Sequence, residues 1–140
     1  MFSNEEEPLF FGSIAEAIEP EEIEINTLGI MNDDGERVEI SYEETQATGM
    51  DGSSTAISYL SGEPGVVSMI REGAVSTALV FEAGKRHHCV YQTPFMPFEV
   101  CVYTKKVENR LVNEGYLELD YMIEIRGARA ERTQFRMELL

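Results

Sequence analysis

The chain has 140 residues, of which 43% are hydrophobic and 9% aromatic, and its formal charge at pH 7 is −15. This length fits a single domain that can bury most of its apolar surface, and the hydrophobic fraction argues against a wholly disordered chain. The acidic excess repels phosphate backbones and anionic lipid, so neither nucleic acid nor a membrane surface is expected as a partner.

The negative charge is concentrated at the start of the chain. The first basic residue is Arg37, and 11 acidic residues precede it. We interpret residues 1–20 as an acidic, poorly defined segment and residues 21–140 as one β-domain. A solvated N-terminus explains the acidic segment better than a docking tail for a basic partner does. Because no apolar run reaches roughly 20 residues and the start lacks basic charge, we expect a cytoplasmic protein without a membrane span.

Most of the chain alternates between apolar and polar residues, which is the pattern of half-buried strands. Residues 8–18 fit a strand or a short helical turn equally well. From Glu21 the period of two is clear, and Asp34-Gly35 supplies the backbone of a tight hairpin turn. The residues expected to face inward after that turn are Val38, Ile40, Tyr42 and Glu44, then Thr55, Ile57 and Tyr59, then Val67, Met69 and Arg71, and then Val75, Thr77, Leu79 and Phe81.

Residues 86–106 are expected to form a hairpin with its turn at residues 93–97, where two prolines lie. If Thr93 pairs with Phe98, His87 lies opposite Thr104. Cys89 and Cys101 then point to opposite faces of the sheet, which predicts two free thiols. A polar connection over residues 107–115 leads to the last two strands, whose inward residues are Leu117, Leu119, Tyr121, Ile123 and Ile125, followed by Thr133, Phe135, Met137 and Leu139.

Short strands at close spacing, with turn signals between them and no amphipathic helix, predict an all-β fold. Because sequential connections are short, the strands should form a single antiparallel meander. One apolar face per strand favours a closed or nearly closed β-barrel of about 8–10 strands, which leaves no exposed edge.

A series of short motifs resembles the YwiB-like family, a family of small bacterial proteins with a domain of unknown function. The motifs run in order over residues 21–140: Gly29, Tyr42-x-Glu44, Thr48-Gly49-x-x-Gly52, Arg71-x-Gly73, Phe81-x-x-Gly84, Tyr91-x-Thr93-Pro94, Thr104, Gly115 and Tyr121. The resemblance implies a calycin-like, lipocalin-related antiparallel barrel. It implies no activity, ligand or catalytic residue. Where the family usually has a glycine after the Tyr-x-Thr-Pro motif, this chain has Phe95-Met96-Pro97.

Polar residues on the inward phase are the candidates for a binding site. They are Tyr42, Glu44, Tyr59, Arg71, His87, Tyr91, Thr93, Thr104 and Tyr121. A charge in phase with apolar residues requires a partner, and Glu44 is the candidate partner of Arg71. The pair is either an internal ion pair that closes one end of the barrel, which we favour slightly, or a ligand clamp in which Arg71 offers donors to a carboxylate or phosphate.

No metal, cofactor or catalytic residue is expected. His87 and Cys89 share a face, but neighbouring His88 points away, and no Cys-x-x-Cys pattern occurs. Cys89 beside His87 lacks an orienting third group, so a nucleophile with its base is not indicated. An enzyme that uses His87, Glu44 or Tyr91 as acid or base has the least support.

The sequence leaves two functions open. The first is a barrel that binds a small apolar or amphipathic molecule, with Arg71 and the tyrosines holding its polar end. The alternative is a barrel filled by its own side chains that acts through its surface or as a homodimer, since large inward residues can fill a barrel of this size.

Overall fold

The computed structural model describes residues 9–18, 21–44, 52–125 and 131–139. These residues form ten strands and one short helix. In chain order they are β1 (Leu9–Ile18), β2 (Glu21–Asp33), β3 (Arg37–Glu43), β4 (Ser54–Leu60), β5 (Val66–Glu72), β6 (Thr77–Glu82), β7 (Arg86–Tyr91), β8 (Phe98–Arg110), α1 (Leu111–Glu114), β9 (Tyr116–Ile125) and β10 (Glu131–Leu139). The predicted all-β fold is confirmed, and residues 9–18 form a strand.

Burial follows the alternation in the sequence. In β3 the buried residues are Val38, Ile40 and Tyr42, and their sequence neighbours are half-buried or exposed. Strand β10 alternates in the same way, with Thr133, Phe135 and Met137 buried. A single apolar face per strand therefore fixes which side of the sheet packs against the core.

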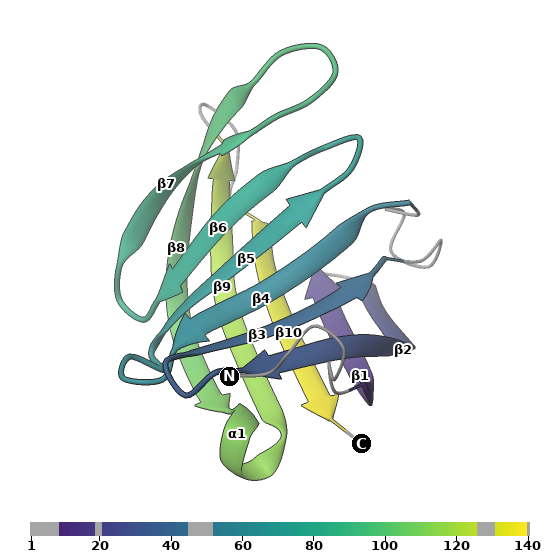
Figure 1. Cartoon of the computed structure of the whole chain (residues 1–140). Helices are drawn as coiled ribbons and strands as arrows, with labels where there is room; N and C mark the ends of the chain where they lie inside the picture. The colour runs from purple at the N-terminus through teal and green to yellow at the C-terminus, as the bar shows by residue number, and fades with distance from the viewer. Residues whose placement is uncertain (1–8, 19–20, 45–51, 126–130, 140) are drawn as a thin grey trace.

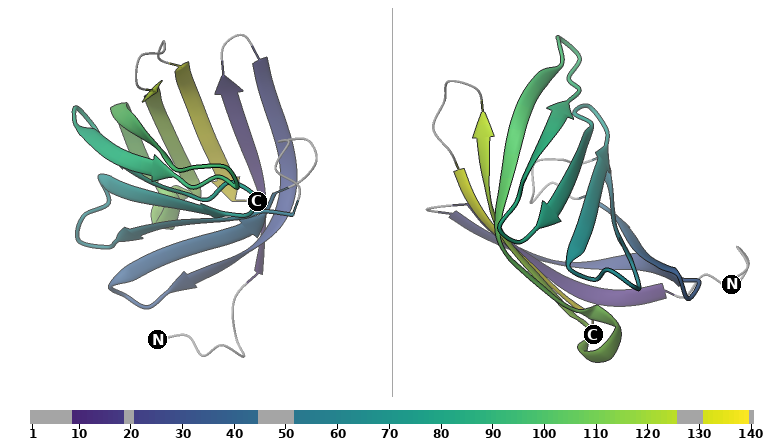
Figure 2. Two further views of the ribbon diagram at one scale, coloured as in Figure 1. Left: turned by 90° about the horizontal axis from the view of Figure 1, so that it is seen from above. Right: turned by 90° about the vertical axis from the view of Figure 1, so that its left-hand side faces the viewer.

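The strands form one antiparallel sheet in the order β6-β5-β4-β3-β2-β1-β10-β9-β8-β7. Neighbours in the sheet are neighbours in the sequence except at β1 and β10, where the two ends of the domain pair. The sheet curls round, so that β3–β6 lie across from β8–β10 (Figures 1 and 2). The interior lies between these two walls.

The two outer strands of the sheet, β6 and β7, approach each other without forming a ladder in the described part of the chain. They are joined at one end by a tight turn, in which the Lys85 amide donates to the Glu82 carbonyl at 3.0 Å. At the other end the isolated bridge between Ser76 and Gln92 has two backbone hydrogen bonds of 2.8 Å. We call the stretch between these two connections the seam.

Rows of paired residues fill the interior. Across the first wall, Ile40, Ile57, Met69 and Leu79 are successive cross-strand partners and are at most 1% exposed. On the opposite wall Leu119 pairs with Phe135 and Leu117 with Met137, all fully buried. The two walls contact each other through Phe81 and Tyr121, whose ring centroids lie 4.6 Å apart.

The register of the β7–β8 hairpin differs from the sequence prediction. Tyr91, and not Thr93, pairs with Phe98, so that His87 lies opposite Val102 rather than Thr104. Prolines at both ends of residues 94–97 cannot donate ladder hydrogen bonds, and the loop closes instead on the Thr93 hydroxyl, which donates to the Met96 carbonyl at 2.6 Å. A shift of two residues preserves the faces, so Cys89 and Cys101 remain on opposite sides and are free, as predicted.

The connection predicted for residues 107–115 is part strand and part helix. Strand β8 continues to Arg110, and the four-residue helix α1 follows it. The charges at 106, 108 and 110 are an outer strand face rather than a loop, because Lys106, Glu108 and Arg110 pair with one another at 3.0–3.2 Å. Gly115 ends α1 with a positive φ of 67° that favours glycine. No helix among the described residues could cross a membrane.

Candidate functional site

A row of polar residues crosses four strands at one end of the first wall. Its members are successive cross-strand partners: Tyr42 on β3, Thr55 on β4, Arg71 on β5 and Thr77 on β6. Tyr42, Thr55 and Thr77 are buried, and the Arg71 side chain is 14% exposed. Together with Glu44 we call these residues the Arg71 cluster.

Glu44 lies just beyond the end of β3 and is held from two sides. Its backbone amide donates to the Ser53 carbonyl at 2.8 Å. Its side chain is 1% exposed and accepts a hydrogen bond from the Thr55 hydroxyl at Oε1, at 2.6 Å. The same oxygen lies 3.6 Å from Arg71 Nε, so the predicted pairing of Glu44 with Arg71 is confirmed. The pair has no net charge, which makes its burial tolerable.

Apart from its tyrosine and arginine side chains, the Arg71 cluster has two atoms that are buried without a hydrogen-bond partner in the described structure. They are Oε2 of Glu44 and Oγ1 of Thr77. A buried polar atom in this state costs about 1–3 kcal/mol relative to one that is satisfied. These two atoms therefore have unused hydrogen-bonding capacity, which makes the cluster the candidate site.

Tyr91 extends the cluster onto β7. It is half-buried and lies next to Gln92, whose bridge to Ser76 joins the end of β7 to the start of β6. Burial raises the pKa of the Tyr91 hydroxyl, and the positive charge of Arg71 partly offsets this rise. The Tyr91 phenol is therefore neutral at physiological pH and can donate or accept a hydrogen bond near Arg71.

The other predicted residues of β7 lie further along the seam. The two atoms His87 Nε2 and Glu82 Oε1 are 3.3 Å apart, and both side chains are about one-third exposed. Cys89 is buried, and burial raises the pKa of its thiol, although the nearby backbone N–H of Val80 lowers it. A thiol with a raised pKa is a poor nucleophile at neutral pH. Among the described residues, no three His, Cys, Asp or Glu side chains gather as a metal site requires.

A second polar row lies on the opposite wall. Thr104 on β8, Tyr121 on β9 and Thr133 on β10 are successive partners and are at most 3% exposed. The Thr104 hydroxyl is buried without a hydrogen-bond partner. The ring contact between Tyr121 and Phe81 places this row toward the turn between β6 and β7, whereas the Arg71 cluster lies toward the start of β6.

The structure does not bring all the predicted site residues together. Tyr42, Glu44, Arg71 and Tyr91 meet at the Arg71 cluster, but Tyr59 lies near the opposite end of β4. Thr93 belongs to the β7–β8 loop, where its hydroxyl accepts the amide of Met96 at 3.1 Å. Two cluster members, Thr55 and Thr77, were not predicted as site residues. Their inward phase in the sequence is the signal that could have identified them.

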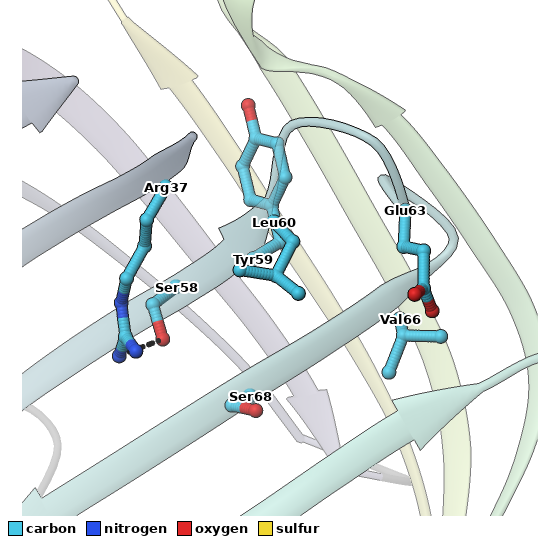
Figure 3. A pocket seen from close by; sticks show the side chains of 7 residues that line it. All are labelled: Arg37, Ser58, Tyr59, Leu60, Glu63, Val66 and Ser68. Carbon is cyan, nitrogen blue, oxygen red and sulfur yellow. Dashed lines mark hydrogen bonds between the residues drawn. The ribbon is translucent and has the colours of Figure 1, made fainter. Parts of the chain in front are cut away.

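A hollow of about 170 Å³ lies on the outer face of the sheet, where β3, β4 and β5 are adjacent (Figure 3). Arg37 reaches over it and donates to the Ser58 hydroxyl at 2.9 Å. The Tyr59 ring points away from these two side chains. Because the Arg37 side chain is 51% exposed and its guanidinium already contacts Ser58 and Glu39, the Arg71 cluster is the better candidate site.

Comparisons with known proteins concern the fold and the family. Residues 12–137 match the model of a protein family described as "Domain of unknown function (DUF1934)". No curated protein matches the chain. The crystal structure of the ywiB protein from Bacillus subtilis is similar, with a TM-score of 0.75 and 22% sequence identity over 96% of this chain and 93% of that chain. At this identity the likeness shows a common fold alone.

Proposed function

We propose a function from the site, because the chain belongs to the DUF1934 family, as its YwiB-like motifs predicted, and the family description leaves the function open. In this proposal the protein binds a small amphipathic molecule at the Arg71 cluster. The observation that supports this proposal is the presence of two buried, unpartnered atoms, Glu44 Oε2 and Thr77 Oγ1, on one wall of the interior. A core that served packing alone would have no reason to bury them unsatisfied.

The surroundings of the cluster suit a molecule with a polar and an apolar end. Tyr42 belongs to the polar row and Tyr91 is close enough to Arg71 to feel its charge, so both supply hydrogen-bonding groups on aromatic rings. The next row inward, represented by Ile40 and Met69, is apolar and fully buried. In this proposal the polar end of the ligand meets the Arg71 cluster, and its apolar end packs against this row.

The full burial of the apolar rows also supports the alternative, an interior filled by its own side chains. Val67, Leu117 and Phe135 are 0% exposed, as in a closely packed core. We therefore limit the proposed ligand to the end of the interior that carries the Arg71 cluster. A protein without any ligand would act through its surface or as a homodimer.

We further infer that the curled sheet is a calycin-like barrel whose weakest closure is the seam. The strand order, in which the first and last strands pair, and the bridge between Ser76 and Gln92 support this inference. Two free cysteines are in keeping with a reducing compartment, so we place the protein in the cytoplasm.

Native mass spectrometry tests the proposed function. We expect the gently purified chain to carry a reproducible small-molecule mass that is absent after denaturation. The Thr77→Val variant, which removes one unpartnered hydroxyl without a change in volume, should lose much of this mass. Arg86→Ala changes an arginine whose side chain is 55% exposed on β7 and serves as the control that keeps it. If neither the wild type nor either variant carries an additional small-molecule mass, the proposal is wrong.

A further inference from the structure

We infer that the polar end of the ligand is an uncharged hydrogen-bond donor, such as an alcohol or a primary amide, rather than a carboxylate or a phosphate. This inference rests on the proposed function and specifies the ligand class of the same site. It differs from the ligand clamp that the sequence left open as the less favoured alternative, in which Arg71 offers its donors to an anion.

The unpartnered atoms of the cluster define what the ligand must supply. Oε2 of Glu44 is a carboxylate oxygen and can only accept while the group is ionised. The other oxygen, Oε1, is already occupied by the Thr55 hydroxyl and faces Arg71. The Thr77 hydroxyl can donate or accept. A donor satisfies Glu44 Oε2, and either a donor or an acceptor satisfies Thr77 Oγ1. A hydroxyl or a carboxamide offers both a donor and an acceptor.

The charges of the cluster exclude a ligand group with a full charge. Arg71 Nε, 3.6 Å from Glu44 Oε1, compensates the one negative charge of the cluster. An anion placed at Oε2 would lie against the Glu44 carboxylate in a site with little solvent to screen it. An ammonium group would meet Glu44 but would add a second positive charge next to Arg71. A neutral donor leaves the compensated pair unchanged.

A matched series of eight-carbon compounds tests the inference on the full chain: 1-octanol, octanamide, octanoate and octylammonium. Their apolar parts are nearly equal, so differences in affinity report the polar group. Dissociation constants at pH 7 follow from protein-observed NMR titration. We expect octanol and octanamide to bind about tenfold more tightly than octanoate and octylammonium. The neutral compounds make one well-placed hydrogen bond and bring no charge into the buried site.

Variants of the two acceptor residues sharpen the test. Glu44→Gln removes the negative charge and leaves Arg71 uncompensated, so the preference should reverse toward octanoate. Thr77→Val keeps the charges and should weaken octanol and octanamide severalfold while octanoate is unchanged. Glu43→Gln is the matched control, since it makes the same change on an exposed neighbouring residue and should have no effect.

The outcomes separate the inference from the function on which it rests. If octanoate binds as tightly as octanol or more tightly, the donor inference is wrong and ligand binding stands. If none of the four compounds binds the wild-type chain, both fail. If Glu44→Gln unfolds, the Thr77→Val series still decides, because an unchanged affinity for octanol in that variant would overturn the placement of the donor.

Discussion

Glu44 and Arg71 are removed from water together, and each depends on the other. Their side chains are 1% and 14% exposed, so water screens the pair poorly. A charge left alone in such a place is far more costly than the same charge at the surface. The position of the two residues near strand ends makes the pair both a closure of one end of the core and the base of the candidate site.

Replacement of Arg71 by Met should therefore destabilise the protein strongly. We expect a loss of about 3–5 kcal/mol in the free energy of unfolding, because the buried Glu44 carboxylate loses its compensating charge. Urea denaturation at pH 7 measures this value. The double variant Glu44→Leu with Arg71→Met should recover most of the loss, since it removes both charges. A single variant as stable as the wild type would show that the pair does not act as a unit.

Asp120 and Arg132 form a second close pair, on the outer face of β9 and β10. Arg132 donates to both carboxylate oxygens, from Nε at 3.1 Å and from Nη2 at 2.7 Å. These hydrogen bonds lower the pKa of Asp120 below its usual value of 3.8. Because the folded-state pKa is the lower one, the stabilisation is complete above the unfolded-state value and is lost as the pH falls through the folded-state value.

Asp120→Asn should destabilise the protein at neutral pH and not in strong acid. The expected loss at pH 7 is about 1 kcal/mol, a modest value because the Arg132 side chain is 38% exposed and partly screened. Unfolding free energies of the wild type and the variant at pH 7 and near pH 2.5 give the comparison. Glu138→Gln, at an exposed position on β10, is the control. A difference that does not change with pH would disprove this account.

At the scale of elements, the period of two in the sequence predicted the strand positions and the buried faces, because one face of each strand must leave water. It could not predict the length of β8, since a strand with a charged outer face and a polar loop have similar composition. The register of β7 and β8 also escaped prediction, because loop hydrogen bonds of Thr93, and not the proline positions alone, set the loop length. The pairing of Glu44 with Arg71 was predictable because both charges fell on inward phases.

The turn between β5 and β6 packs against Ser53, which lies just before β4. A Cβ atom on Gly73 would overlap the Ser53 hydroxyl and would lie 2.8 Å from the Ser53 Cβ. The Ser53 carbonyl in turn accepts the Glu44 amide at 2.8 Å. The close approach of these two segments therefore helps to position Glu44.

Gly73→Ala should lower stability by about 1–3 kcal/mol, the usual cost of overpacking, because Ser53 has to move. Ser53→Gly removes the two atoms that clash most closely, so the double variant should be more stable than Gly73→Ala alone. Thermal and urea unfolding of the three proteins test this coupling. If the effects of the two substitutions on stability simply add, so that Ser53→Gly does not reduce the loss caused by Gly73→Ala, the contact between the turn and Ser53 is not the cause of that loss.

At the scale of the whole molecule, the pairing of β1 with β10 moves the weak point of the sheet away from the chain ends. The weak point is the seam, in the middle of the sequence. Ser76 and Gln92 exchange two backbone hydrogen bonds. Because alternate residues of a strand point their backbone groups to the same side, the amides of Ala78 and Val90 also face the seam, where no ladder follows the bridge in the described structure.

Amide hydrogen exchange should therefore be faster at Ala78 and Val90 than at residues of the inner strands. Ile57 is the reference, since β4 has a ladder on each side and the residue is 1% exposed. We expect protection factors at the two seam residues to be at least about tenfold lower, because their exchange requires only local opening. NMR-detected exchange at neutral pH gives the values residue by residue. Equal protection at Ala78, Val90 and Ile57 would mean that β6 and β7 close the sheet in solution as a continuous ladder.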